Sequence, residues 1–311
     1  MANITANDGN YTRSAGSVDD PLYVFLAALN IFLSITASLS NVLILVALHK
    51  VTSIYPPTKL LFRCLAVTDL GVGLITQPLF TIDLLSGITD LDIIWDHDVM
   101  LSITIVSTVV LSAVSILSST AISVDRLLAL MMGLRYRHVV SLRRVRALIT
   151  CVWLLSSALA AGIIFGTYKI QSIIFNVFFV FIILCILTSF ISYTKIYLRL
   201  RHHQIQLQEN QQQRGQPLPN RKEIPLNIAR YKKTVSSIAW VQFAFIICYL
   251  PFSVCSILSF NEALNIGSAS DVAASFLFLN SSLNPILYCW KIKDVRQAVK
   301  DTIKFNCCAS S

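Results

Sequence analysis

Charged side chains are scarce in this chain: 13% of its 311 residues are charged, whereas 55% are hydrophobic. Soluble domains carry roughly 25% charged residues. The scarcity is uneven, because six of seven long apolar blocks contain no Asp, Glu, Lys or Arg. This argues against a soluble globular protein. The blocks are Leu22–Leu48, Leu65–Leu85, Val99–Val124, Ala147–Tyr168, Ile170–Thr194, Thr234–Phe260 and Val272–Trp290.

The blocks also lack the alternation of apolar and polar residues that membrane β-strands show. A helix needs about 20 apolar residues to cross the hydrocarbon core. A buried helix of a soluble protein would explain one such block, but not seven. We therefore predict an all-α membrane protein, a seven-transmembrane helix bundle over 22–290. A tail, 1–21, precedes the bundle, and a short amphipathic helix with a tail, 291–311, follows it.

Basic residues are nearly absent from one side of the predicted bundle. If the N-terminal tail is extracellular, Arg13 and Lys169 are the outer basic residues, and the other 23 of the 25 Lys and Arg residues lie inside. Cytoplasmic loops carry an excess of Lys and Arg. We therefore predict a plasma-membrane protein with its C-terminus in the cytoplasm. The net charge of +9 is a topology signal, and it does not indicate nucleic-acid binding.

Cysteine is missing from every predicted outer loop, so we expect no stabilising disulfide. The outer tail instead carries glycosylation sequons at Asn3 and Asn10. At the other end, the basic amphipathic segment of 291–305 is expected to lie on membrane lipid. Cys307 and Cys308 follow it and form a candidate palmitoylation site, the alternative being two unmodified thiols.

The connections between blocks differ in length. The segment around Gly166–Ser172 is so short that the fourth and fifth blocks must be antiparallel neighbours. The longest connection, 201–230, is rich in glutamine over Gln204–Gln216 and is predicted to be a flexible cytoplasmic loop.

One carboxyl group, that of Asp69, lies deep in the second block. An ionisable group at that depth is costly and indicates function. Ser115, Asn280, Ser281 and Asn284 could supply oxygens beside it. Carboxylate, hydroxyl and amide oxygens suit a hard cation such as Na⁺. A protonated Asp69 bonded to Asn284 explains the same residues equally well.

Two further features indicate a helix bundle that switches. Pro251 and Pro285 lie inside blocks, where proline kinks a helix and frees carbonyl groups. Asp125-Arg126 ends the third block at its cytoplasmic edge. Each feature has an ordinary alternative, since kinks also occur in transporters and an ion pair can simply end a helix.

Together these motifs resemble the rhodopsin-like G-protein-coupled receptors over essentially the whole chain. Each motif falls in its proper block, in the family's order. The matching residues are Asn41, Leu65–Asp69, Asp125-Arg126-Leu127, Trp153, Tyr193, Cys248–Pro251 and Leu283–Tyr288.

The resemblance implies a receptor, not an enzyme, that binds an extracellular ligand and activates a heterotrimeric G protein. Arrestin and receptor kinase are further implied partners, and Na⁺ is an implied allosteric ion, with no cofactor. The implied sodium site comprises Asp69, Ser115, Asn280 and Asn284. The implied activation switch comprises Asp125, Arg126, Tyr193, Tyr249, Pro251, Asn284, Pro285 and Tyr288. The implied ligand pocket comprises Gln77, Thr104, Thr108, Ser112, Tyr249, Phe252, Ser256 and Phe278, each of which could equally be bundle lining.

Departures from the family pattern narrow the range of possible ligand classes. Thr108 replaces the aspartate of amine receptors, and Phe278 replaces the lysine of opsins. The absent outer disulfide, the short second outer loop and Cys185 in place of a proline resemble the melanocortin branch. Adenosine, cannabinoid and lysophospholipid receptors are its wider neighbours. The acidic cluster of melanocortin receptors is missing. The choice between a melanocortin-like and an adenosine-like receptor therefore remains open.

Other departures concern the switch. Leu127 and Tyr249 replace the usual tyrosine and tryptophan, which leaves open a receptor fold that signals poorly. Tyr231–Lys233 stands where the family carries an acidic partner for Arg126. That difference predicts a weakly locked, basally active receptor. A transporter would instead show internal repeats, and none is apparent.

Overall fold

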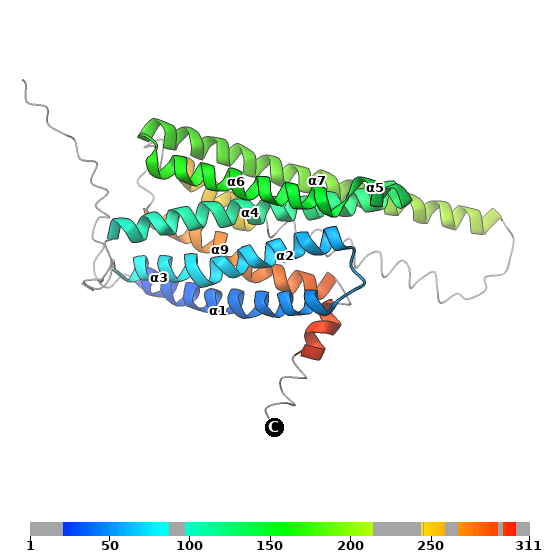
Figure 1. Cartoon of the computed structure of the whole chain (residues 1–311), viewed down its shortest axis with the longest axis horizontal. Coiled ribbons are helices and arrows are strands. Elements are labelled where there is room, and N and C mark those ends of the chain that lie inside the picture. The colour runs from blue at the N-terminus through cyan, green and yellow to red at the C-terminus, as the bar shows by residue number, and fades with distance from the viewer. Residues whose placement is uncertain are drawn as a thin grey trace, which may run out of the picture.

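The structure is a computed structural model that describes six stretches of the chain. They are residues 21–86, 97–213, 244, 246–258, 267–291 and 295–302. Every secondary-structure element in these stretches is a helix, which confirms the all-α prediction for the described residues. Figure 1 shows the long helices lying alongside one another as a bundle.

The first half of the bundle contains three long helical stretches. The helix α1 spans Pro21–Lys50. The second stretch is interrupted, with α2 over Pro56–Gly71, the π-helical turn η1 over Val72–Thr76 and α3 over Gln77–Ser86. The third, α4, spans His97–Met132. The two prolines that begin α2 fit there, because the first helical turn leaves its N–H groups unpaired.

A compact turn connects α4 to the next long helix. It consists of the 3₁₀ turn η2 over Gly133–Arg135 and the short helix α5 over Tyr136–Val139. Gly133 has a φ of 52°, a left-handed conformation that glycine adopts without steric cost. Ser141 then caps α6, which spans Leu142–Phe165, and its hydroxyl accepts a hydrogen bond from the backbone N–H of Arg144.

Only Gly166 and Thr167 separate α6 from α7, which spans Tyr168–Gln213. A side chain at Gly166 would collide with the carbonyl oxygen of Gly162, so the tight turn requires glycine. The two helices are therefore antiparallel neighbours, as the short loop predicted (Figure 1).

The prediction of a flexible loop over 201–230 is wrong for its first part, because α7 continues to Gln213. Glutamine, leucine and arginine are good helix formers, and no glycine or proline interrupts the chain before Gly215. In Figure 1 this end of α7 extends well beyond the bundle. Residues 214–230 lie outside the described part.

Five of the described helices are long and apolar enough to cross a membrane: Pro21–Lys50, Pro56–Ser86, Val99–Met132, Leu142–Phe165 and Lys169–Arg199. A shorter apolar helix, Ile246–Leu258, covers part of the sixth block. The seventh block forms α9, Gly267–Lys291, with Pro285 inside it. The final helical residues, 295–302, bury Val295 against the end of the bundle, and Lys50 Nζ donates to Thr302 Oγ1 at 3.0 Å.

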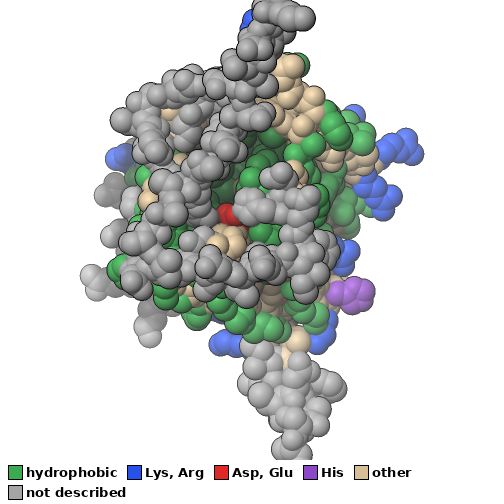
Figure 2. Space-filling view, turned by 90° about the vertical axis from the view of Figure 1, so that its left-hand side faces the viewer, with side chains coloured by type: hydrophobic (Ala, Val, Ile, Leu, Met, Phe, Trp, Pro, Cys, Tyr) green, Lys and Arg blue, Asp and Glu red, His purple; other side chains and the backbone are tan. Residues whose placement is uncertain are grey.

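The distribution of side chains differs from that in a soluble protein, although apolar clusters still fill much of the interior. Large apolar side chains such as Phe32, Leu154 and Phe190 are exposed on the flanks, while Asn30, Asp69 and other polar residues are fully buried. Figure 2, which looks at the bundle end-on, shows hydrophobic side chains around much of the described surface. This arrangement suits lipid outside and a polar interior.

Candidate functional site

The carboxylate of Asp69, on α2, is the centre of the buried polar interior. Asn284 Nδ2 donates to its Oδ2 at 2.7 Å. Ser281 and Ser115 donate to its Oδ1 at 2.9 and 3.2 Å. The group is fully buried, and all three donors are neutral, coming from α9 and α4. Their side chains therefore solvate the carboxyl group in place of water.

The structure differs from the implied sodium set at one position. Ser281, rather than Asn280, is the second α9 residue hydrogen-bonded to Asp69. The amide of Asn280 points elsewhere and donates to the Tyr249 hydroxyl at 3.2 Å. Asn41 Nδ2 donates to the carbonyl of Ser281 at 3.1 Å. Neighbouring residues of α9 thus connect Asp69 with Tyr249 on one side and with α1 on the other.

The residues around Asp69 fit a sodium ion by chemistry. The ion prefers hard oxygen ligands, and one carboxylate with two hydroxyl groups supplies them. The amide oxygen of Asn284 is a further candidate ligand, because its amide lies against the carboxylate. Among the described residues there is no cluster of three or more His, Cys, Asp or Glu side chains, so a site built for zinc is not found there.

A second buried carboxylate, Asp125, lies near the C-terminal end of α4. Arg126 Nη2 pairs with its Oδ2 at 3.0 Å. Thr58 Oγ1 donates to the same oxygen at 2.9 Å, and the Tyr136 hydroxyl donates to Oδ1 at 2.6 Å. These contacts join α2, α4 and α5. We call Asp125, Thr58 and Tyr136 the latch.

The latch holds the phenol of Tyr136 in its protonated form. Burial, together with the hydrogen bond to Asp125, raises the pKa of Tyr136 to about 12. The ring of Tyr55 packs on that of Tyr136 with centroids 5.4 Å apart, and its hydroxyl donates to the Val140 carbonyl at 2.9 Å. Sequence reasoning missed Thr58 and Tyr136, because no local pattern links them to Asp125.

Arg126 is less enclosed than its partner, since its side chain is 40% exposed and Asp125 only 3%. Tyr193 is buried against Leu127 and Leu130, so the leucine that replaces the family's tyrosine packs on another switch residue. The side chain of Tyr288 and the whole of 231–233 lie outside the described residues, and the predicted weak lock stays a prediction.

The predicted ligand-pocket residues differ in their surroundings. Tyr249 and Phe278 are buried in one apolar cluster, where the Phe278 ring meets Phe80 edge-on at 5.3 Å. Thr104 and Ser256 donate their hydroxyl hydrogens to carbonyls of their own helices, at 2.9 and 2.8 Å. The remaining members that carry no such bond are Thr108 and Phe252, which are partly buried, and Ser112, which is buried.

Gln77 is the exception in this set. It is fully buried, and neither its amide nitrogen nor its amide oxygen has a hydrogen-bond partner. The hydroxyl of the preceding Thr76 and Oδ1 of Asn30 are also buried and unpaired. Each such group costs about 1–3 kcal/mol and calls for an explanation. A polar ligand group that pairs with Gln77 would provide one.

The modification sites lie elsewhere. Asn3, Asn10, Cys307 and Cys308 are outside the described residues, so both modifications stay predictions. The five cysteines whose side chains the structure describes, Cys64, Cys151, Cys185, Cys248 and Cys255, all carry free thiols.

A helical bundle with an apolar exterior, a buried carboxylate centre and an Asp-Arg pair at one end is the arrangement that the resemblance to seven-helix membrane receptors predicted. Comparison with known families agrees. The family described as 7 transmembrane receptor (rhodopsin family) matches residues 40–173 and 164–288. The chain therefore belongs to the rhodopsin family of G-protein-coupled receptors, which are multi-pass membrane proteins and not enzymes.

Individual relatives are similar at about the same level. Melanocortin receptor 5 of Rattus norvegicus is 25% identical over 298 residues, which cover 90% of this chain and 84% of that receptor. Trace amine-associated receptor 1 of Macaca mulatta is 26% identical over 323 residues, covering 96% and 91%. Probable G-protein coupled receptor 45 of Homo sapiens is 26% identical over 314 residues, covering 89% and 82%.

Proposed function

We propose that this receptor binds, in the outer half of the bundle, a ligand that presents an uncharged polar group to it, and activates a heterotrimeric G protein at the opposite end. The observation that carries the proposal is the chain of buried contacts along α9. It runs from Tyr249, through Asn280 and Ser281, to Asp69. A ligand that binds one arrangement of this chain better than another shifts the receptor towards it.

The membrane orientation is part of the proposal. Basic residues gather at the ends of the helices that carry the latch, so this end faces the cytoplasm of the cell, at the plasma membrane. The G protein would then approach Arg126, with arrestin and receptor kinase acting at the same face.

Signalling by the full-length receptor tests the coupling. Basal second-messenger levels would be measured for wild type and Arg126→Ala at equal surface expression, across the G-protein classes. We expect Arg126→Ala to lower basal signalling by about tenfold, the effect of about 1.4 kcal/mol. Arg135→Ala, which changes an exposed arginine of the following turn, is the matched control. Identical signalling by wild type and Arg126→Ala in every pathway, with and without a ligand library, would contradict coupling.

For the ligand, we propose a group with an amide-like donor and acceptor that pairs with Gln77. Melanocortin peptides and nucleosides both offer such groups, so the choice between a melanocortin-like and an adenosine-like receptor remains. The similarity to a trace amine-associated receptor does not favour an amine, because Thr108 occupies the position of the amine-binding aspartate. A panel of peptides, nucleosides and lipids, tested on wild type and Gln77→Leu, decides: responses lost in Gln77→Leu support the pairing, and unchanged responses refute it.

We also propose Na⁺ as an allosteric ion beside Asp69, with Ser115, Ser281 and Asn284 as its further ligands. The ion would stabilise the arrangement in which α2, α4 and α9 are joined at this point. What supports the proposal is that every described donor around the carboxylate is neutral, so an ionised Asp69 has no cationic partner among them. The effect of Na⁺ on thermal stability tests it.

A further inference from the structure

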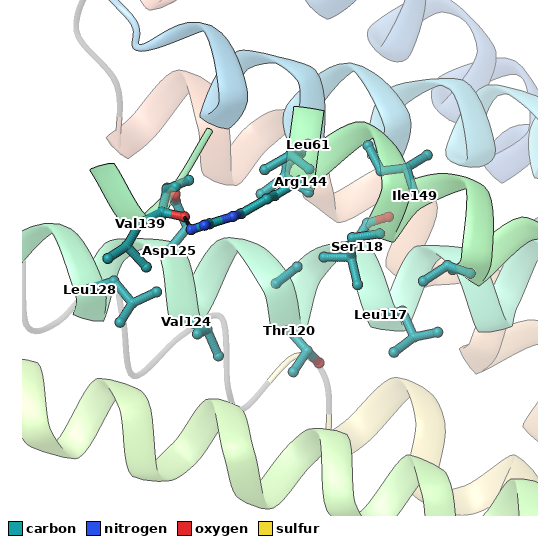
Figure 3. Close-up of a pocket in the computed structure, with 15 residues that line it drawn as sticks. Leu61, Leu117, Ser118, Thr120, Val124, Asp125, Leu128, Val139, Arg144 and Ile149 are labelled. Carbon is teal, nitrogen blue, oxygen red and sulfur yellow. Dashed lines mark hydrogen bonds between the residues drawn. The ribbon is translucent and has the colours of Figure 1, made fainter. Parts of the chain in front are cut away.

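A cavity of about 380 Å³ lies between α2, α4, α5 and α6, beside the latch (Figure 3). Its volume falls within the range of about 300–1,000 Å³ that is typical of small-molecule sites. Its walls are almost entirely apolar. They are formed chiefly by Leu117, Val124 and Leu128 of α4 and by Leu148, Ile149 and Val152 of α6.

The polar groups on these walls already have partners. Ser118 Oγ donates to the sulfur of Cys64 at 3.5 Å, and Thr120 Oγ1 donates to the Ile116 carbonyl at 2.8 Å. Asp125 is occupied by the latch and by its arginine neighbour. A polar occupant would find little to pair with deep in the cavity, and an apolar chain fits it better.

The guanidinium of Arg144 lies at one end of the apolar cavity. The Arg144 side chain reaches along the cavity towards Val139, as Figure 3 shows, and its Nη1 donates to that residue's carbonyl at 2.8 Å. Nη1 also donates to the carbonyl of His138, so both hydrogen bonds of the guanidinium to described residues use this nitrogen. Arginine carries five N–H donors, so others can bind an anion. Arg137, Arg143 and Arg146 are exposed nearby in the sequence and add positive charge.

The cavity wall belongs to the surface that faces lipid. Leu148, which lines the cavity, is 46% exposed, and Leu154 and Leu155 further along α6 are also exposed. A lipid chain could therefore enter sideways from the bilayer. In the orientation proposed above, this end of the bundle lies in the cytoplasmic leaflet, whose lipids carry negative charge.

We propose that the cavity binds an acyl chain of an anionic phospholipid from this leaflet, with the headgroup on Arg144. The chain would pack against α4 and α6 and would touch Val139 and Val140, next to the latch. The bound lipid would thereby hold α5 in place against α4. The site requires neither the extracellular ligand nor the G protein, and it rests only on the proposed orientation.

Photolabelling of the purified full-length receptor tests the site. The receptor is placed in phosphatidylcholine nanodiscs that contain a trace of phosphatidylserine or phosphatidylcholine with a diazirine in its chain. Labelled peptides are then mapped by mass spectrometry. We expect phosphatidylserine to label the α4 and α6 walls about fivefold more than phosphatidylcholine, since one basic residue near an anionic surface is worth about 1 kcal/mol.

Two variants separate the headgroup from the chain. Arg144→Gln should lower phosphatidylserine labelling to the phosphatidylcholine level, whereas Arg143→Gln, its exposed neighbour outside the cavity lining, should leave it unchanged. Ile149→Trp fills the cavity and should abolish wall labelling by both lipids. Ala121→Leu, on the opposite wall, replaces it if that variant does not fold, as judged by its thermal unfolding.

Labelling that survives Ile149→Trp or Ala121→Leu, or that spreads evenly over the lipid-facing helices, would overturn the site. Equal labelling by the two lipids, unaffected by Arg144→Gln, would overturn the headgroup contact. An epitope tag at the C-terminus, tested for antibody access in intact cells, checks the orientation independently. The antibody test therefore detects a wrong orientation, whereas the labelling test detects the absence of the lipid site.

Discussion

Asp69 and Asp125 are both buried carboxylates, yet the structure holds them in different ways. Asp125 has a guanidinium beside it, together with hydrogen bonds from a phenol and a threonine hydroxyl. Among the described residues, the donors to Asp69 are all neutral and come from Ser115, Ser281 and Asn284. The carboxyl group of Asp125 therefore has a cationic partner, while that of Asp69 has none within the part of the chain that the structure describes. A mobile cation has a reason to bind at Asp69 but not at Asp125.

The contrast also suggests different roles. Asp125 ties together α2, α4 and α5 at one end of the bundle and leaves Arg126 partly exposed. Asp69 ties α2 to α4 and α9 in the interior. A change at Asp69 alters how helices pack at the centre of the bundle, whereas a change at Asp125 alters the surface that a G protein would meet.

The largest expected effect is on the response to sodium. Thermal unfolding of the solubilised receptor would be measured in about 150 mM NaCl and in the same concentration of KCl. Because a ligand that binds only the folded state stabilises it, we expect NaCl to raise the unfolding temperature of wild type by several degrees. Asp69→Asn should unfold at the same temperature in both salts.

Asp125→Asn is the matched control, since it removes the other buried carboxylate and should retain the sodium effect. If the two variants lost the effect together, the distinction between the carboxylates would be wrong. An equal sodium effect in wild type and Asp69→Asn would show that the ion does not bind at Asp69.

A smaller effect is expected from loosening the latch. Tyr136→Phe removes one hydrogen bond to a carboxylate, which contributes about 1.5–3 kcal/mol, while the ring keeps its packing. We expect basal signalling to rise several-fold in cells at equal surface expression. Tyr55→Phe, which loses a bond to a carbonyl oxygen instead, should change it less. Basal signalling that falls in Tyr136→Phe would show that the latch supports the active arrangement.

The smallest expected effect is that of pH on the latch. Because the pKa of Tyr136 is raised to about 12 in the folded protein, the latch stabilises the fold fully below the phenol's ordinary pKa of about 10 and loses that contribution as pH rises through 12. Between about pH 6 and 9, the stability difference between wild type and Tyr136→Phe should therefore stay constant. If the stability difference changed across this pH range, a group other than Tyr136 would be titrating.

Much of this protein could be read from its sequence because lipid imposes simple rules. The apolar blocks, the deep Asp69 and the Asp125-Arg126 pair were recognisable without any contact being known. The extent of α7 was misjudged, since a glutamine-rich segment can be either loop or helix and local composition does not decide between them.

The pairing of side chains was harder to predict, because it depends on which face each helix turns to its neighbours. Sequence position gave no reason to prefer Ser281 over Asn280 beside Asp69, since neighbouring helical residues point about 100° apart. The π-helical turn Val72–Thr76 adds a further rotation between Asp69 and Gln77 that the sequence did not reveal.

By itself, the sequence determined the membrane class, the helical bundle and the family, because the length and composition of apolar segments follow from the thickness and chemistry of a bilayer. Only the tertiary structure decided the partners of the buried carboxylates, the latch through Tyr136 and the apolar cavity beside Arg144. These features join residues far apart in the chain, and they arise from the way helices rotate and pack against one another.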